Sequence, residues 1–137
     1  MTVFVDSSVW FAAAVTRDRS NARAKAILGE AGPLVTSDHV LVETWLLLNS
    51  REGQSAADRF WGALRGGVAH VESVGPKDIE AAWTIGEVFS DQSFSIVDRT
   101  SFAVMERLGL TRAASFDDDF AIFRYGRSRE RAFEILR

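Results

Sequence analysis

Short apolar runs that favour β-strands alternate with helical segments along this chain, and this alternation constrains the fold more than any other feature. The expected strands are Val3–Val5, Leu34–Thr36, Val68–Val74 and Arg112–Phe116. The expected helices are Ser7–Val15, Ser20–Leu28, Ser37–Ser50, Ser55–Leu64, Pro76–Phe89 and Ser95–Leu108. This order predicts an α/β fold with a mostly parallel sheet. The 137 residues contain no Pro- or Ser-rich linker, so we expect a single domain spanning residues 1–137.

Composition narrows the chemistry that is open to the chain. It has no cysteine and two histidines, which excludes disulfide scaffolds, thiol nucleophiles and thiolate metal sites. Any metal would have to be bound mainly by oxygen. The apolar run Val9–Val15 is too short to span a bilayer and follows no basic segment. We therefore expect a cytoplasmic protein that is not inserted in a membrane.

Four positions place acids where an α/β sheet binds ligands. Asp6 and Asp117 directly follow expected strands, and the carboxyl ends of parallel strands share one edge of the sheet. Glu43 lies in an apolar helical segment, and Asp98 lies in the first turn of another helix. Singly, each has an ordinary explanation: a turn, a solvated helix acid, or the acidic half of a capping box with Ser95. Together they are the oxygen ligands that a Mg²⁺ or Mn²⁺ site needs.

Four sequence blocks carry a resemblance to a known family. VDSSVW, HVLVETWLLL, FSIVDRTSFAVMERLGL and AASFDDDF occur in this order and cover nearly the whole chain. Together they resemble PIN-domain proteins, most closely the VapC-type ribonuclease toxins of type II toxin–antitoxin systems. The resemblance implies a three-layer α/β/α sandwich and a metal-dependent endoribonuclease that cleaves RNA phosphodiester bonds.

The resemblance also implies roles for individual residues. The motifs match the family's acids at Asp6, Glu43, Asp98 and Asp117, with Asp119 as an additional acid. Ser8 matches a small hydroxyl position near the metal, and Ser115 stands where many members have threonine. We expect one or two Mg²⁺ or Mn²⁺ ions. Asp6, Asp98 and Asp117 would bind metal directly, while Glu43 and Asp119 would bind a second ion or orient water. Asp118 is interpreted as a solvated or capping residue.

Arginine is the chain's dominant base, outnumbering lysine fourteen to two. Because its guanidinium binds phosphate bidentately, we expect RNA contacts from Arg99, Arg124 and Arg127, with Arg129 and Arg131 as further candidates. A solvated charged face is the alternative for the C-terminal arginines. The net charge of −3 by itself disfavours RNA binding, but without the five candidate site acids sixteen bases face fourteen acids.

Partner proteins are also implied. VapC-type toxins pair with a small antitoxin that covers the acidic site, and we expect this partner together with a homodimer. The large aromatic side chains either line such interfaces or fill the core: Trp10, Phe11, Trp45, Phe60, Trp61 and Trp83.

Other functions remain open at this stage. A PIN-like module could bind RNA or a partner without catalysis, and a structure-specific nuclease acting on DNA has a related acid pattern. A haloacid-dehalogenase-type phosphatase is disfavoured because Ser8 stands where a second acid is needed and only Lys25 and Lys77 are present. A receiver domain likewise lacks a suitably placed lysine.

Overall fold

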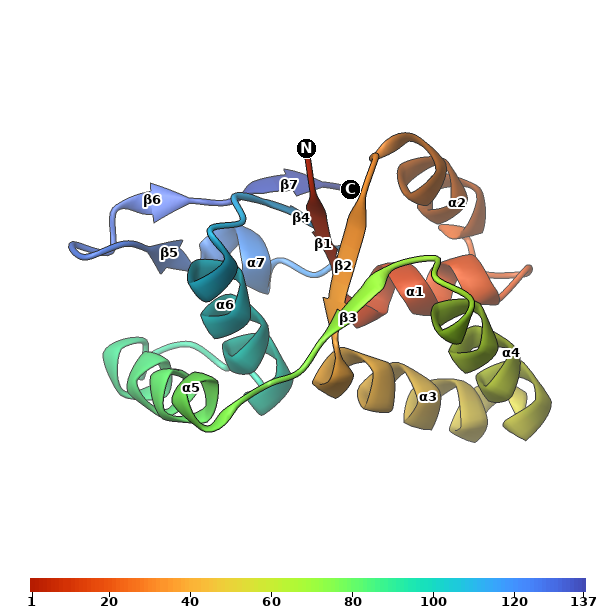
Figure 1. The fold of residues 1–137 in the computed structure, drawn as a ribbon, viewed down its shortest axis with the longest axis horizontal. Helices are drawn as coiled ribbons and strands as arrows, with labels where there is room; N and C mark the ends of the chain where they lie inside the picture. The colour runs from red at the N-terminus through yellow and green to blue at the C-terminus, as the bar shows by residue number, and fades with distance from the viewer.

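The computed structural model describes residues 1–137 and contains a five-stranded sheet in the order β3-β2-β1-β4-β7 (Figure 1). All neighbouring strands in this sheet are parallel, so their carboxyl ends lie at one edge. The strands are β1 (Val3–Val5), β2 (Leu34–Ser37), β3 (His70–Glu72), β4 (Arg112–Ala114) and β7 (Glu134–Leu136). A separate antiparallel hairpin consists of β5 (Arg124–Tyr125) and β6 (Arg131–Ala132).

Helices connect the strands and flank the sheet. They are α1 (Ser7–Ala14), α2 (Asn21–Glu30), α3 (Asp38–Glu52), α4 (Gln54–Arg65), α5 (Pro76–Val88), α6 (Ile96–Leu108) and α7 (Asp119–Ile122). Helix α3 packs against α4, and α5 packs against α6. Figure 1 shows these two pairs on either side of the point where β2 enters α3, with the β5–β6 hairpin extending beyond α6. The expected α/β architecture with a parallel sheet is confirmed. None of the helices combines the length and apolar character that a membrane span requires.

The helices that carry Glu43 and Asp98 begin at side-chain caps. The Ser37 hydroxyl accepts a hydrogen bond from the Val40 backbone N–H at the start of α3. The expected capping box at the start of α6 is confirmed, because the Asp98 N–H donates to the Ser95 hydroxyl and the Ser95 N–H donates to the Asp98 carboxylate. Gly109, with φ of 69°, ends α6 in the left-handed conformation that glycine tolerates.

Two expected strands are longer than the observed ones. β3 is confined to His70–Glu72, because the chain must leave the sheet to begin α5 after Gly75. β4 ends at Ala114, and the side chain of the next residue, Ser115, donates to the buried Asp6. The sequence pattern predicts no helix or strand for the C-terminal segment after Phe116. β7 pairs there with β4 along its whole length.

Phenylalanines fill much of the core beside β4 and α6. The rings of Phe102 and Phe123 stack at 4.2 Å, and the Phe120 ring meets Phe102 edge-on at 4.9 Å. Phe133 packs on Phe123 and thereby anchors the C-terminal segment. Among the other aromatic residues, Trp10 and Phe60 are buried in the core, Phe11 and Trp45 are partly buried, and Trp61 and Trp83 are exposed.

An ion-pair network fixes α6 relative to its neighbours. Arg107 of α6 donates to both carboxylate oxygens of the buried Asp78 in α5 and to Glu72 of β3. Burial alone would raise the pKa of Asp78, but the Arg107 guanidinium and the Gly75 N–H hold it below its usual value. These bonds join α6 to both neighbouring elements. The network therefore holds the helix that carries Asp98 against α5 and β3.

Candidate active site

Asp6 is the most tightly held of the acids. It directly follows β1, is 2% exposed, and its backbone N–H donates to the Ala114 carbonyl at the end of β4. Its carboxylate accepts hydrogen bonds from the hydroxyls of Ser115 at 2.8 Å and Ser8 at 2.9 Å. Asp6 is the N-cap residue of α1, but its side chain makes no capping hydrogen bond, and the Ser8 and Ser115 hydroxyls hold its carboxylate instead.

The two serines connect Asp6 to the turn that carries Asp117. The Ser8 hydroxyl accepts a hydrogen bond from the Phe116 N–H at 2.9 Å, and the Ser115 hydroxyl accepts one from the Asp117 N–H at 3.1 Å. Each hydroxyl therefore bridges β1 to the residues after β4. The predicted meeting of Asp6 and Asp117 at one edge is what the structure shows.

Glu43 approaches this edge from the second turn of α3. Burial raises the pKa of its carboxyl, the negative charges of Asp6 and Asp117 raise it further, and a hydrogen bond from Ser7 opposes these effects. Val42, next to Glu43 in sequence, is exposed. Glu43 thus belongs to the acidic cluster in space.

Asp98 and Asp119 complete the cluster. Burial, contact with the Asp119 carboxyl and the charge of Asp6 raise the pKa of Asp98 to about 7, against the lowering effect of the Ser95 N–H. Asp117 as a whole is exposed, yet desolvation of its carboxyl and the nearby charge of Asp6 raise its pKa to about 6. These shifts have one shared cause beyond burial: carboxylates that repel each other.

No arginine, lysine or histidine side chain pairs with any of the five acids. The donor set consists of carboxylate and hydroxyl oxygens, which suits Mg²⁺ or Mn²⁺. No three of these side chains stand in an arrangement that already encloses a metal ion. The residues fit an oxygen-bound cation by their chemistry and by their position at one edge of the sheet.

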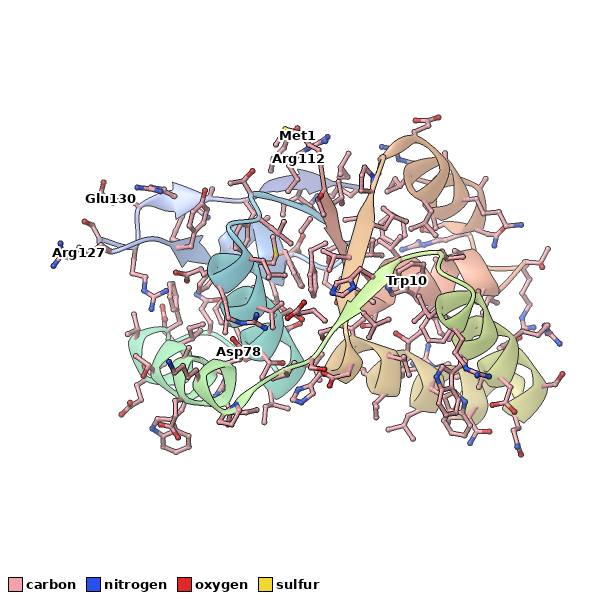
Figure 2. All side chains as sticks on the ribbon, viewed as in Figure 1. Met1, Trp10, Asp78, Arg112, Arg127 and Glu130 are labelled. Carbon is pink, nitrogen blue, oxygen red and sulfur yellow. The ribbon has the colours of Figure 1, made fainter.

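The expected RNA-contacting arginines lie away from the acids or have other partners. Arg99 Nε donates to the Phe94 carbonyl, and its side chain lines a cavity with Ile79 and Trp83. Arg124 donates to three backbone carbonyls at the end of α7. Figure 2 shows Arg127 near the outer end of the β5–β6 hairpin. Their contacts with RNA remain predictions.

Two other arginines lie beside the cluster and were not singled out from the sequence. Arg19 and Arg51 line a groove of about 340 Å³ whose walls include Glu43 and Asp117. Arg51 could have been found, because Glu43, Leu47 and Arg51 are spaced four residues apart and share one face of α3. Arg19 lies between α1 and α2, where no periodic pattern marks it. Asp118 is exposed and pairs with Arg137, in agreement with its interpretation as a solvated residue.

Comparisons with known proteins agree with this architecture. The family model described as PIN domain matches residues 3–124. The 23S rRNA-specific endonuclease VapC20 of Mycobacterium tuberculosis is 40% identical over 120 residues, which cover 87% of this chain and 92% of that protein. Its crystal structure, of a toxin that cleaves the sarcin–ricin loop, matches with a TM-score of 0.82 at 38% identity, covering 85% of this chain and 91% of that one. A toxin–antitoxin complex from Klebsiella pneumoniae shares the fold, with a TM-score of 0.69 at 15% identity, covering 88% and 91%.

Proposed function

The chain belongs to the PIN-domain family, and from that premise we propose that it is a metal-dependent endoribonuclease acting as the toxin of a toxin–antitoxin pair. One observation carries the proposal: five carboxylates converge at one edge of the sheet, and no cationic side chain is paired with any of them. Residues 1–137 constitute one PIN domain in this proposal. The 40% identity to a 23S rRNA-specific endonuclease supports ribosomal RNA as the substrate class.

Each acid has a role in the proposed reaction. Asp6, Asp98 and Asp117 would hold a Mg²⁺ or Mn²⁺ ion, and Glu43 and Asp119 would hold a second ion or orient the attacking water. A divalent cation bound there lowers the pKa of water and neutralises charge on the phosphodiester. The Ser8 and Ser115 hydroxyls both donate to Oδ2 of Asp6 and hold this carboxylate in place at the carboxyl edge of the sheet. They thereby position Asp6 without touching the substrate.

We further propose two protein partners. The apolar side chains Val42 and Leu46 of α3 and Ile96 of α6 are each more than half exposed beside the acidic cluster. Exposed apolar patches of this kind mark interaction surfaces, which supports a homodimer formed over this face. An antitoxin that covers the acids would protect the cell from uncontrolled RNA cleavage. Structures of toxin–antitoxin complexes share the fold, which supports such a partner.

The test is cleavage of a defined RNA by the purified chain. We expect cleavage of a sarcin–ricin stem-loop RNA with Mg²⁺ or Mn²⁺ and none with excess EDTA. Asp98→Asn should lower the cleavage rate at least ~100-fold, because the charge that holds the cation is removed. Asparagine retains an oxygen that can accept from the Ser95 N–H, so the cap of α6 is preserved.

Asp118→Asn is the matched control, because Asp118 lies between two site acids in sequence but pairs with Arg137 at the surface. It should cleave like the unmodified chain. Undiminished cleavage by Asp98→Asn would contradict the proposal. Binding of RNA without any cleavage would instead favour a non-catalytic module, and cleavage of DNA but not RNA would favour a DNA nuclease.

A further inference from the structure

In the groove beside the acids, two free arginines and two of the candidate catalytic groups share one cavity. It runs along α1 and α3, has a volume of about 340 Å³, and is lined at one end by Glu43 and Asp117 and elsewhere by Arg19 and Arg51. RNA whose scissile phosphate reached the acids would extend to either side of them. The groove therefore offers a path for the adjoining part of the strand.

The guanidinium groups of Arg19 and Arg51 are not engaged by acids. Neither forms an ion pair or a hydrogen bond within the chain, whereas Arg17, Arg107, Arg112, Arg129 and Arg137 each pair with a carboxylate. Arg51 instead lies over the ring of Phe11, with its guanidinium carbon 5.5 Å from the ring centre. This contact supports the side chain while leaving its N–H groups available for an anion.

One acid also lines the groove away from the cluster. The Asp18 carboxylate accepts a hydrogen bond from the backbone N–H of Ser20, just before α2, at 2.8 Å. It engages neither of the two arginines. Two unpaired positive groups therefore remain in the groove for a ligand.

We propose that Arg19 and Arg51 form a phosphate-binding subsite for the RNA nucleotide that adjoins the scissile bond. The inference rests on the proposed ribonuclease function and adds to it the residues that place the strand. Arginine suits this role because its planar fork binds phosphate oxygens bidentately. The position of the pair also explains how an acidic cluster can receive a polyanion: the strand is held by positive groups beside the cluster while the cleaved phosphate lies over it.

The test separates binding from cleavage. The Kd of the stem-loop RNA is measured in EDTA, where no cleavage occurs, and KM and kcat are measured with Mg²⁺. Arg19→Ala and Arg51→Ala should each raise Kd and KM about fivefold, because each removes charge-assisted hydrogen bonds. The kcat should change by less than about twofold, since neither residue touches the reacting atoms. Loss of both arginines should reduce the slope of log Kd against log salt by about 0.7, the value for one phosphate contact to a single strand.

Arg65→Ala is the matched control, since Arg65 is exposed, has no partner and lines a different cavity beside Trp61. It should leave Kd and KM unchanged. Arg51→Gln keeps much of the side-chain stem over Phe11 and should behave as Arg51→Ala. If the unmodified chain cleaves RNA and the double variant retains its Kd and KM, the subsite is wrong. A fall in kcat at constant KM would also overturn it. If the unmodified chain does not cleave RNA, the proposed function fails instead.

Discussion

At the scale of single residues, one hydroxyl joins two acids of the candidate site. Ser115 is fully buried, donates to Asp6 and accepts from the Asp117 N–H. Ser115→Ala removes one hydrogen-bond partner from the Asp6 carboxylate and one from the Asp117 N–H. We expect the free energy of unfolding to fall by about 1–3 kcal/mol. We also expect Mg²⁺ affinity to fall about 10- to 100-fold, as when a group that orients a metal ligand is lost. Urea denaturation and titration calorimetry measure the two effects.

A second buried serine provides the control for this substitution. The Ser101 hydroxyl in α6 is also fully buried but has no hydrogen-bond partner. Ser101→Ala should therefore leave the free energy of unfolding unchanged within about 0.5 kcal/mol or raise it. Equal destabilisation by both substitutions would show that loss of volume, and not loss of the Asp6 and Asp117 contacts, determines the effect at Ser115.

At the scale of elements, the C-terminal strand β7 holds the end of β4 and the site residue Ser115 that follows it. β7 pairs with β4, and the carbonyl of Leu136 accepts a hydrogen bond from the Ser115 N–H at 3.1 Å. Phe133 fastens this strand to the core. Phe133→Ala should lower the free energy of unfolding by about 3 kcal/mol, through loss of buried area and the cavity left behind. Ile122→Ala, at a position that is 41% exposed against 5% for Phe133, should cost less than about 1 kcal/mol. Comparable urea midpoints for the two variants would show that the C-terminal strand is not anchored by Phe133.

The acids and the C-terminal segment differ in how far the sequence predicts them. Asp6 and Asp117 could be placed together because parallel strands bring their carboxyl ends to one edge. The segment after Phe123 could not, because charged residues interrupt its short strands and no apolar run such as Val3–Val5 marks them. Its arginines were therefore interpreted by charge, whereas the structure pairs Arg129 with Glu106 and Arg137 with Asp118. Partners distant in sequence decide whether an arginine is free, and a single sequence does not reveal them.

At the scale of the whole molecule, the net charge of −3 arises from acids concentrated at one edge of the sheet. Without those five acids the remaining charge is slightly positive, so the overall acidity does not oppose an RNA substrate. The gathering of acids at one edge of the sheet has an energetic consequence for the metal-free chain. Folding brings Glu43, Asp98 and Asp117 close to other carboxylates, and the pKa of each is raised above its usual value.

Raised carboxyl pKa values predict how stability responds to pH. Between pH 5 and 8 the folded chain binds protons that the unfolded chain has already released, so the free energy of unfolding falls as pH rises. The metal-free Tm should therefore be lower at pH 8 than at pH 5. The pKa values of Glu72 and Asp78 are lowered, so both groups ionise below this range in the folded and in the unfolded chain. Their contribution to the free energy of unfolding is therefore constant between pH 5 and 8.

A cation that fits the cluster reverses this trend, because it relieves the repulsion among ionised carboxylates and binds the folded state selectively. Mg²⁺ or Mn²⁺ should raise the Tm strongly at pH 8 and weakly at pH 5, where protons compete for the same oxygens. Asp98→Asn should raise the metal-free Tm at pH 8 and reduce the increase that the metal produces, whereas Asp118→Asn should change neither. Differential scanning calorimetry of the unmodified chain and the two variants, at pH 5 and pH 8 with and without metal, measures these Tm values. A metal-free Tm that rises from pH 5 to pH 8 would mean that the five carboxylates are not held close enough to repel one another.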